Sequence, residues 1–243
     1  MGIISWQNYP SIVILTGAGV SVASGLPTYR GAGGLWENDD VARYALADTW
    51  RSDPLAVWKT FGALRASILD AQPNAAHRAL AALEQRIDRD AELHLVTQNV
   101  DGLHQAAGSH DVIELHGSLR HTRCSNERCA LPPFEDTRTH FDRVPVCPEC
   151  HALQRPAIVL FGEPIDVADE RRSRDALREC DLFVAVGTSG TVTPAANFVR
   201  SAKYEGAHTV FINAEPMEPP NPYFDEVILG PAEEILPDVV AGA

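Results

Sequence analysis

The sequence predicts an α/β fold in which a doubly wound parallel sheet carries a smaller insert. Short apolar runs rich in β-branched residues predict strands buried on both faces, at residues 12–15, 93–96, 157–161, 182–186, 209–212 and 227–229. Helical patterns lie between several of these runs, as over residues 74–84 and 169–180. Strands that alternate with helices favour a parallel sheet that binds ligands at the carboxyl ends of its strands.

The alternating pattern breaks between residues 119 and 155. Pro, Cys and charged residues dominate this stretch, and it contains no long apolar run. So short and polar a stretch cannot bury a core of its own. A chain of 243 residues suits one main domain with such an insert. We therefore expect a main domain of residues 1–118 and 156–243, and an insert of residues 119–155.

The chain is acidic, with 20 Lys and Arg residues against 33 Asp and Glu residues and a formal net charge of -13. A field of this sign repels phosphate backbones and anionic membranes. The first residues show no basic region followed by an apolar one, and no later apolar run approaches the length of a membrane span. We expect no nucleic-acid or membrane partner and a cytoplasmic location.

Four of the five cysteines lie in the expected insert, as Cys124-x4-Cys129 and Cys147-x2-Cys150. Two short knuckles of this kind can surround one Zn²⁺ ion tetrahedrally, with Zn–S distances of about 2.3 Å and no open coordination position. Such a closed site is structural. A redox pair or an iron–sulfur cluster is the alternative for the same four thiols. The fifth cysteine, Cys180, ends a helical pattern and is expected to be an inert core thiol.

A glycine-rich turn, Gly17-Ala18-Gly19, directly follows the first predicted strand. Glycines at this point let the backbone approach a pyrophosphate, with free N–H groups at the start of the next helix. The usual dinucleotide fingerprint would place a third glycine where Val22 stands, and the next glycine is Gly25. This departure argues against a hydride-transfer dehydrogenase, and a tight turn that binds no ligand stays open as an alternative.

Polar side chains follow the strand predicted at residues 93–96, as Gln98, Asn99 and Asp101. Donors and acceptors at the carboxyl edge of a sheet are typical of a ligand site, although an Asn/Asp turn with local backbone bonds has the same composition. His116 lies where the main domain and the insert must meet. An imidazole titrates near neutral pH, which suits a general base, but a single histidine is more often a surface or core residue.

Several short motifs follow one another along the chain, and each is weak alone. They are Gly17-Ala-Gly-Val-Ser21, Ser24-Gly-Leu-Pro27 with Tyr29-Arg30, Thr97-Gln-Asn-Val-Asp101-Gly-Leu-His104, Glu114-Leu-His116-Gly117, the four cysteines, Phe161-Gly-Glu163, Gly187-Thr-Ser189 and Asn213-Ala-Glu215. In this order, over residues 17–232, they resemble the sirtuin family of NAD-dependent protein lysine deacylases. Segments 72–77, 187–190, 194–196 and 230–232 are similar to bacterial deacylases related to the desuccinylating sirtuins. The resemblance implies a Rossmann-like main domain, NAD as co-substrate and one structural zinc ion per chain.

The resemblance also assigns roles to the residues that match the family's motifs. NAD would be bound by Gly17, Ala18, Gly19, Ser21, Thr28, Tyr29, Arg30, Trp36, Gln98, Asn99, Asp101, Gly187, Thr188, Ser189, Asn213, Glu215 and Ala232. His116 would be the catalytic base, and Asn99 would lie beside the reacting ribose. The substrate peptide would add as a strand, with acyl-lysine held by Val159, Phe161, Gly162 and Glu163. The zinc ligands would be Cys124, Cys129, Cys147 and Cys150.

The reaction that the resemblance implies moves an acyl group from protein or peptide lysine to ADP-ribose, and releases nicotinamide and O-acyl-ADP-ribose. Desuccinylating relatives grip the acyl carboxylate with a Tyr and an Arg three residues apart. Counting from Asp53 places Phe61 and Leu64 at these positions, so we expect a deacetylase or a depropionylase. A desuccinylase or demalonylase is the alternative if Arg65 replaces the missing clamp. Protein mono-ADP-ribosyl transfer, and a module that senses NAD or nucleic acid without turnover, are further alternatives.

Overall fold

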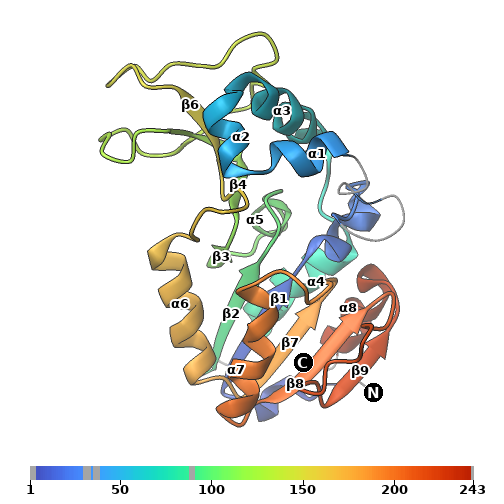
Figure 1. The fold of residues 1–243 in the computed structure, drawn as a ribbon. Helices are drawn as coiled ribbons and strands as arrows, with labels where there is room; N and C mark the ends of the chain where they lie inside the picture. Colours follow the sequence, from blue (N-terminus) through green and yellow to red (C-terminus); the bar gives the residue numbers. More distant parts are fainter. Residues whose placement is uncertain (1–3, 30–33, 35–38, 88–90, 242–243) are drawn as a thin grey trace.

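The computed structural model describes residues 4–29, 34, 39–87 and 91–241. Its elements form two regions, drawn in Figure 1 with a large sheet and its helices below and a smaller region above. No helix within the described ranges is long and apolar enough to cross a membrane.

The large region is built on a parallel sheet of six strands in the order β3-β2-β1-β7-β8-β9. Its strands are β1 (Ser11–Thr16), β2 (Glu92–Thr97), β3 (Val112–Glu114), β7 (Leu182–Val186), β8 (His208–Asn213) and β9 (Glu226–Leu229). The strand order reverses between the neighbours β1 and β7, and open parallel sheets bind ligands at such a switch point. The predicted doubly wound α/β sheet is confirmed.

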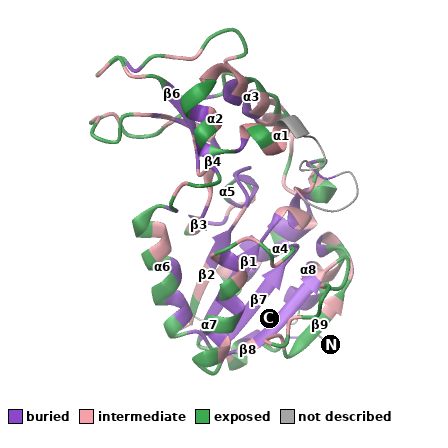
Figure 2. Cartoon of the chain, in the orientation of Figure 1, coloured by how far each residue is buried: buried purple, intermediate pink, exposed green. Residues whose placement is uncertain are grey.

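Helices cover both faces of this sheet. The helices on one face are α4 (Ala75–Arg86) and α8 (Ala232–Ala241), and those on the other are α6 (Val167–Arg178) and α7 (Phe198–Tyr204). Alternate residues of β1 serve the two cores, because Ile12 and Ile14 join the first apolar cluster while Val13 and Leu15 join the second. Every residue of β1 is therefore buried, as the purple strands in Figure 2 show.

Three strands form a separate antiparallel sheet in the order β5-β4-β6. They are β4 (Gly117–Cys124), β5 (Phe134–Glu135) and β6 (Gln154–Ile158). The sequence predicts a strand of the buried, parallel kind at residues 157–161. That prediction is wrong, because β6 ends at Ile158 and pairs antiparallel with β4. An apolar run indicates burial but does not indicate which strand will lie beside it.

The last predicted strand, at residues 227–229, is present but is not buried on both faces. Val227 is 56% exposed and Leu229 is 52% exposed. β9 lies at the edge of the main sheet, where β8 is its only partner among the described strands, so no second described strand lies beside it.

Helix α3 (Pro54–Asp70) packs on the small sheet, and α1 (Asp39–Tyr44) and α2 (Ala47–Ser52) pack against α3. Asp53 caps the start of α3, where proline is well tolerated as the first helical residue. Trp58 of α3 joins a third apolar cluster with Leu119 of β4 and Ile158 of β6. The strands of the predicted insert thus share a core with helices that precede it, and a separate domain at residues 119–155 stays a prediction.

Candidate active site

A cavity of about 1170 Å³ lies at the carboxyl ends of β1, β2, β7 and β8, and also touches α3 and the segment that follows β6. Most residues predicted for NAD or acyl-lysine line it, namely Gly17, Ala18, Gly19, Thr28, Tyr29, Gln98, Asn99, His116, Val159, Phe161, Gly162, Glu163, Gly187, Thr188, Ser189, Asn213, Glu215 and Ala232. Ser21 and Asp101 line a small adjoining cavity of about 20 Å³, which Tyr29 and Asn99 also line. Arg30 and Trp36 lie outside the described residues.

The glycines of the first turn allow two loops to touch. The N–H of Gly19 donates to the carbonyl oxygen of Gly187 at 2.8 Å, which joins the loops after β1 and β7. A Cβ atom on Gly19 would lie 2.7 Å from the Cα of Gly187, and one on Gly17 would lie 2.7 Å from its carbonyl oxygen. Any larger residue would therefore push the loops apart at the point where the strand order reverses.

Asn99 is held at the end of β2 by two hydrogen bonds from its side-chain amide. Nδ2 donates to the carbonyl oxygen of Gly17 at 3.1 Å and to Ser21 Oγ at 3.2 Å. Ser21 Oγ in turn donates to Asp101 Oδ2 at 2.7 Å. Within the described part of the chain, the buried Oδ1 of Asn99 has no hydrogen-bond partner. A buried acceptor without a donor marks a place where a ligand or a water molecule completes the bonding.

Two buried histidines support the strand ends without lining the main cavity. His104 lies in the short helix α5 (Leu103–Ala106), and its Nε2 is 2.9 Å from Thr16 Oγ1. The ring centroids of His77 and His104 are 4.9 Å apart. Burial lowers the pKa of His77 to about 4 and the pKa of His104 to about 3, so both rings are neutral at pH 7.

His116 lies in the connection between β3 and β4, and it lines the main cavity. Its Nδ1 lies 2.9 Å from the carbonyl oxygen of Gln98. A carbonyl oxygen can only accept, so Nδ1 carries the proton and Nε2 keeps a free lone pair. Burial lowers the pKa of His116, and the hydrogen bond to Gln98 opposes this shift only in part. The imidazole is therefore neutral at pH 7, and Nε2 can accept a proton from a bound group.

The segment after β6 forms the cavity wall predicted for acyl-lysine. The N–H of Val159 donates to the carbonyl oxygen of His116 at 2.9 Å, which ties this wall to the imidazole. Among the residues that the structure describes, none donates a hydrogen bond to the carbonyl oxygen of Val159. The N–H of Phe161 donates to Ala45 and its carbonyl oxygen accepts from Ala47, at 2.8 and 3.0 Å. A substrate peptide added as a strand therefore cannot pair with the backbone of Phe161.

Residues after β7 and β8 extend the cavity along the edge of the sheet. Gln98 Nε2 donates to Thr188 Oγ1 at 2.8 Å, which joins the loops after β2 and β7. Asn213 Nδ2 donates to the carbonyl oxygen of Glu215 at 2.8 Å, and Glu215 itself is exposed. A carboxylate in this place can accept hydrogen bonds from both hydroxyls of a ribose.

Arg65 is fully buried in the small region and does not line the cavity. It donates at 2.7 to 2.9 Å to three backbone carbonyl oxygens, those of Leu119, His121 and Arg138. It also donates to Thr122 Oγ1 at 3.1 Å and lies 3.6 Å from Asp136 Oδ2. Because its donors are engaged there, the alternative in which Arg65 grips an acyl carboxylate is wrong.

The charge of the cavity lining is negative. Phe61, at one of the two positions of the family's clamp, lines the cavity, whereas Leu64, at the other, lines only the small adjoining cavity. Among the described lining residues there is no Lys and no Arg, while five are Glu. An acyl chain that ends in a carboxylate would find no cationic side chain among them.

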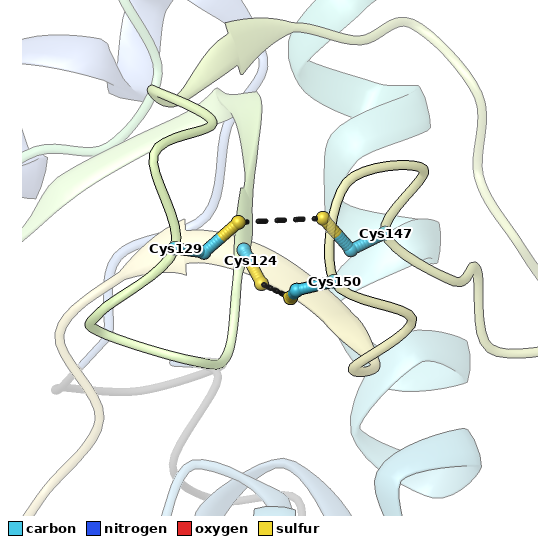
Figure 3. A group of neighbouring side chains, drawn as sticks. All are labelled: Cys124, Cys129, Cys147 and Cys150. Carbon is cyan, nitrogen blue, oxygen red and sulfur yellow. Dashed lines mark hydrogen bonds between the residues drawn. The ribbon is translucent and has the colours of Figure 1, made fainter.

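The four cysteines of the small region come together, as Figure 3 shows. Their Sγ atoms all lie within 4.8 Å of one another, with 3.5 Å between Cys124 and Cys150 and 3.6 Å between Cys129 and Cys147. A disulfide needs about 2.05 Å, so neither pair is bonded. Four sulfurs at about 2.3 Å from one Zn²⁺ ion would lie about 3.8 Å apart, so the cluster fits a closed zinc site. Cys180 is buried apart from them in the main core.

The sequence did not point to the groups that hold the acyl-lysine wall. These are Ala45 and Ala47, which pair with Phe161, and Arg155, which forms an ion pair with Glu163. Alanines in a short connection carry no chemical signal. The only available signal was an arginine two residues before an apolar run, which requires an acidic partner when it is buried.

Comparison with known proteins gives one consistent family. A model of the Sir2 family matches residues 17–194. NAD-dependent protein deacylase 1 of Pseudomonas aeruginosa is 45% identical, over 96% of this chain and 94% of its own. The NAD-dependent protein deacylase of Pasteurella multocida is 42% identical, over 95% of this chain and 96% of its own.

Two solved structures share the fold over almost the whole chain. A Sir2 homologue in complex with NAD superposes with a TM-score of 0.87 at 36% identity, covering 98% of this chain and 90% of its own. A Sir2 structure with a p53 peptide and NAD+ has a TM-score of 0.78 at 28% identity, covering 97% and 94%.

Proposed function

The chain belongs to the Sir2 family and is an NAD-dependent protein deacylase, and we propose that it removes small neutral acyl groups, acetyl or propionyl, from lysine side chains. The observation that carries this preference is the lining of the cavity, where Phe61 is present and Arg65 is not. A buried carboxylate without a cation or donors is strongly unfavourable. Succinyl and malonyl groups would meet that cost here, and acetyl and propionyl groups would not.

NAD would lie along the carboxyl edge of the main sheet. The glycine loops fit this role because they bring the turns after β1 and β7 together, and Asn99 offers an unpartnered Oδ1. Ser21 and Asp101 would act indirectly, because Ser21 accepts a hydrogen bond from the Asn99 amide and donates one to Asp101. When bound, NAD supplies the ribose carbon to which the acyl oxygen is transferred as nicotinamide leaves. Its remaining partners would be Ala18, Thr28, Tyr29, Gln98, Thr188, Ser189, Asn213, Glu215 and Ala232.

His116 would serve as the general base through Nε2. The Gln98 carbonyl oxygen holds the proton on Nδ1, which fixes both the tautomer and the direction of the ring. Because the ring is neutral at pH 7, it can take a proton without first losing one. The hydrogen bond from the N–H of Val159 to the His116 carbonyl oxygen fixes the position of the base relative to the acyl-lysine wall.

Acyl-lysine would enter along the segment after β6. The carbonyl oxygen of Val159 can accept a hydrogen bond from the amide N–H of acyl-lysine, and the Phe161 side chain would form an apolar wall. The substrate backbone would pair at Gly162 and beyond, since the backbone of Phe161 is already paired with the chain before α2.

A zinc ion at the four cysteines would bind the end of β4 to the loop before β6. With all four positions filled by thiolates it would have no catalytic coordination site, so its role is structural. Four of the five cysteines gather at one metal site and not in disulfides spread along the chain, which supports the proposed cytoplasmic location.

Mass spectrometry of one lysine peptide in acetylated, propionylated and succinylated forms tests this proposal, with NAD and without it. We expect NAD-dependent loss of acetyl and propionyl, and succinyl loss at least about 100-fold slower, because its carboxylate is left unpaired. Succinyl loss at the acetyl rate would contradict the acyl preference. Nicotinamide release that does not require an acylated peptide would favour protein mono-ADP-ribosyl transfer instead.

A further inference from the structure

Arg155 and Glu163 form a buried ion pair beneath the acyl-lysine wall. Arg155 lies on β6 and is 4% exposed. Its two terminal nitrogens donate to the two carboxylate oxygens of Glu163 at 2.5 and 2.9 Å, so the pair is bidentate. Burial raises the pKa of Glu163, but its hydrogen bonds with Arg155 and Leu160 outweigh burial and lower the pKa overall. The carboxylate is therefore charged at pH 7.

The pair closes the chain between residues 158 and 163 into a turn. Glu163 Oε2 also accepts the N–H of Leu160 at 2.9 Å. Arg155 donates in addition to the carbonyl oxygen of Ile158 at 3.3 Å. Val159 and Phe161 lie within this turn, so the direction of the Val159 carbonyl group and of the Phe161 side chain depends on the groups that close it.

Glu163 also compensates the charge of two arginines, Arg155 and Arg123. Arg155 of β6 and Arg123 of β4 are cross-strand partners, and like charges in opposite positions of a sheet repel. Among the ion pairs of the described residues, Glu163 is the only partner of Arg155. The ring of Trp50 lies on another side of the guanidinium, with its centroid 5.4 Å from Cζ. Without the carboxylate, Arg155 would be a buried cation beside a second cation.

We propose that Arg155 and Glu163 are positioning residues whose ion pair sets the shape of segment 158–163 and thereby the affinity for the acyl-lysine peptide. This inference rests on the proposed function, in which Val159 and Phe161 form the acyl-lysine wall. The family resemblance places Glu163 among the substrate residues. In the structure its carboxylate is turned to Arg155 and to the N–H of Leu160, so it acts on the substrate through the turn.

Steady-state kinetics of Glu163→Gln tests the inference, because this change keeps the side-chain shape and removes its charge. We expect the KM for an acetylated peptide to rise about tenfold, while kcat and the KM for NAD change less than about twofold. Arg155→Lys keeps the positive charge without the bidentate geometry, so its peptide KM should rise less, by about threefold. Arg51→Gln is the matched control, since it removes an exposed ion pair with Asp48 on α2 and should change none of these values.

Hydrogen–deuterium exchange of segment 158–163 gives a second readout that needs no turnover. We expect faster exchange of the amides of Leu160 and Phe161 in both Glu163→Gln and Arg155→Lys, and no change in Arg51→Gln. An unchanged peptide KM with unchanged exchange would overturn the inference. So would a parallel loss of kcat, zinc content and thermal midpoint, because that result would indicate general damage to the fold. If the unmodified chain deacylates no peptide, the proposed function fails, and the exchange data alone decide whether the ion pair shapes the segment.

Discussion

The candidate active site has two sides that are held in place by different interactions. The side proposed for NAD, called the cofactor side, comprises the loops after β1, β2, β7 and β8, and the side proposed for acyl-lysine, called the substrate side, comprises segment 158–163 and the small sheet. The cofactor side grows out of a six-stranded sheet whose faces are covered by two apolar clusters. The substrate side rests on a three-stranded sheet that shares a smaller apolar cluster with α2 and α3 and otherwise depends on polar groups. Those groups are the ion pairs of Arg65 with Asp136 and Arg155 with Glu163, and the four cysteines.

This difference determines which changes can unfold each side. Apolar burial does not depend on a single group, whereas a buried ion pair becomes unfavourable as soon as one partner is removed. A thiolate cluster likewise depends on its metal ion. The substrate side should therefore be open to disruption by one change of charge or of metal, while the main sheet stays folded.

Removal of zinc should have the largest effect. A structural zinc site contributes roughly 10 kcal/mol or more to the folding of its module. In Cys147→Ser, or after chelation, we expect the chain around residues 119–155 to lose its structure and deacylation to fall below detection. Zinc content, far-UV circular dichroism and hydrogen exchange measure this, and exchange in β1 and β7 should stay slow.

Cys180→Ala is the matched control for the zinc experiment, because Cys180 is a buried cysteine outside the cluster. It should retain its zinc and its activity. Full activity in a zinc-free Cys147→Ser protein would show that the substrate side does not need the metal.

The substitution Arg65→Met should have the next largest effect. It leaves the buried Asp136 carboxylate without its buried guanidinium partner, and we expect a loss of about 3 kcal/mol in the free energy of unfolding. Urea unfolding of the small region measures it. Arg138→Gln is the control, because Arg138 contacts the same carboxylate from a side chain that is 67% exposed, and it should cost less than about 1 kcal/mol. Equal losses in the two variants would contradict the importance of burial.

Mild acid should have the smallest effect, and should act on the cofactor side. His77 and His104 have pKa values of about 4 and about 3 in the fold, against about 6.5 when unfolded. As the pH falls through 6.5 the unfolded chain therefore binds more protons, so this contribution to stability is complete well above pH 6.5 and is lost progressively as the pH falls toward 4. Between pH 7.5 and 6.0 the loss should be about 1.5 kcal/mol for the two groups together.

Urea unfolding at a series of pH values checks the acid prediction. His104→Gln should reduce the slope of stability against pH. His110→Gln, at a side chain that is 78% exposed, should leave it unchanged. A slope that is the same in all three proteins would mean that the buried rings do not carry the pH dependence.

The sequence predicts the main sheet well because its longer strands are largely apolar runs between helical patterns. It cannot reveal β3, which has only three residues and no period of its own. It also cannot decide the partner of β6 or the exposure of β9, because both depend on which strand lies alongside.

The candidate site was predictable where chemistry sits in short motifs, as at Gly17, Asn99 and His116, which all line one cavity. It was not predictable where distant segments meet. Arg65 has four hydrogen-bond partners and one ion-pair partner between residues 119 and 138, and no local pattern points to them. One signal was available, since Trp58, Phe61, Arg65 and Ile68 follow the spacing of one helix face, and an arginine on an apolar face must be paired.

We propose that one cavity joins the NAD site to the acyl-lysine site, with His116 as the base. The most direct measurement counts nicotinamide and deacetylated peptide by mass spectrometry, in the unmodified chain and in His116→Ala. We predict one nicotinamide for each acetyl group lost, and a fall of both products by about 100-fold or more in His116→Ala with zinc content and thermal midpoint unchanged. Full turnover in His116→Ala, or acetyl loss without NAD, would contradict the claim.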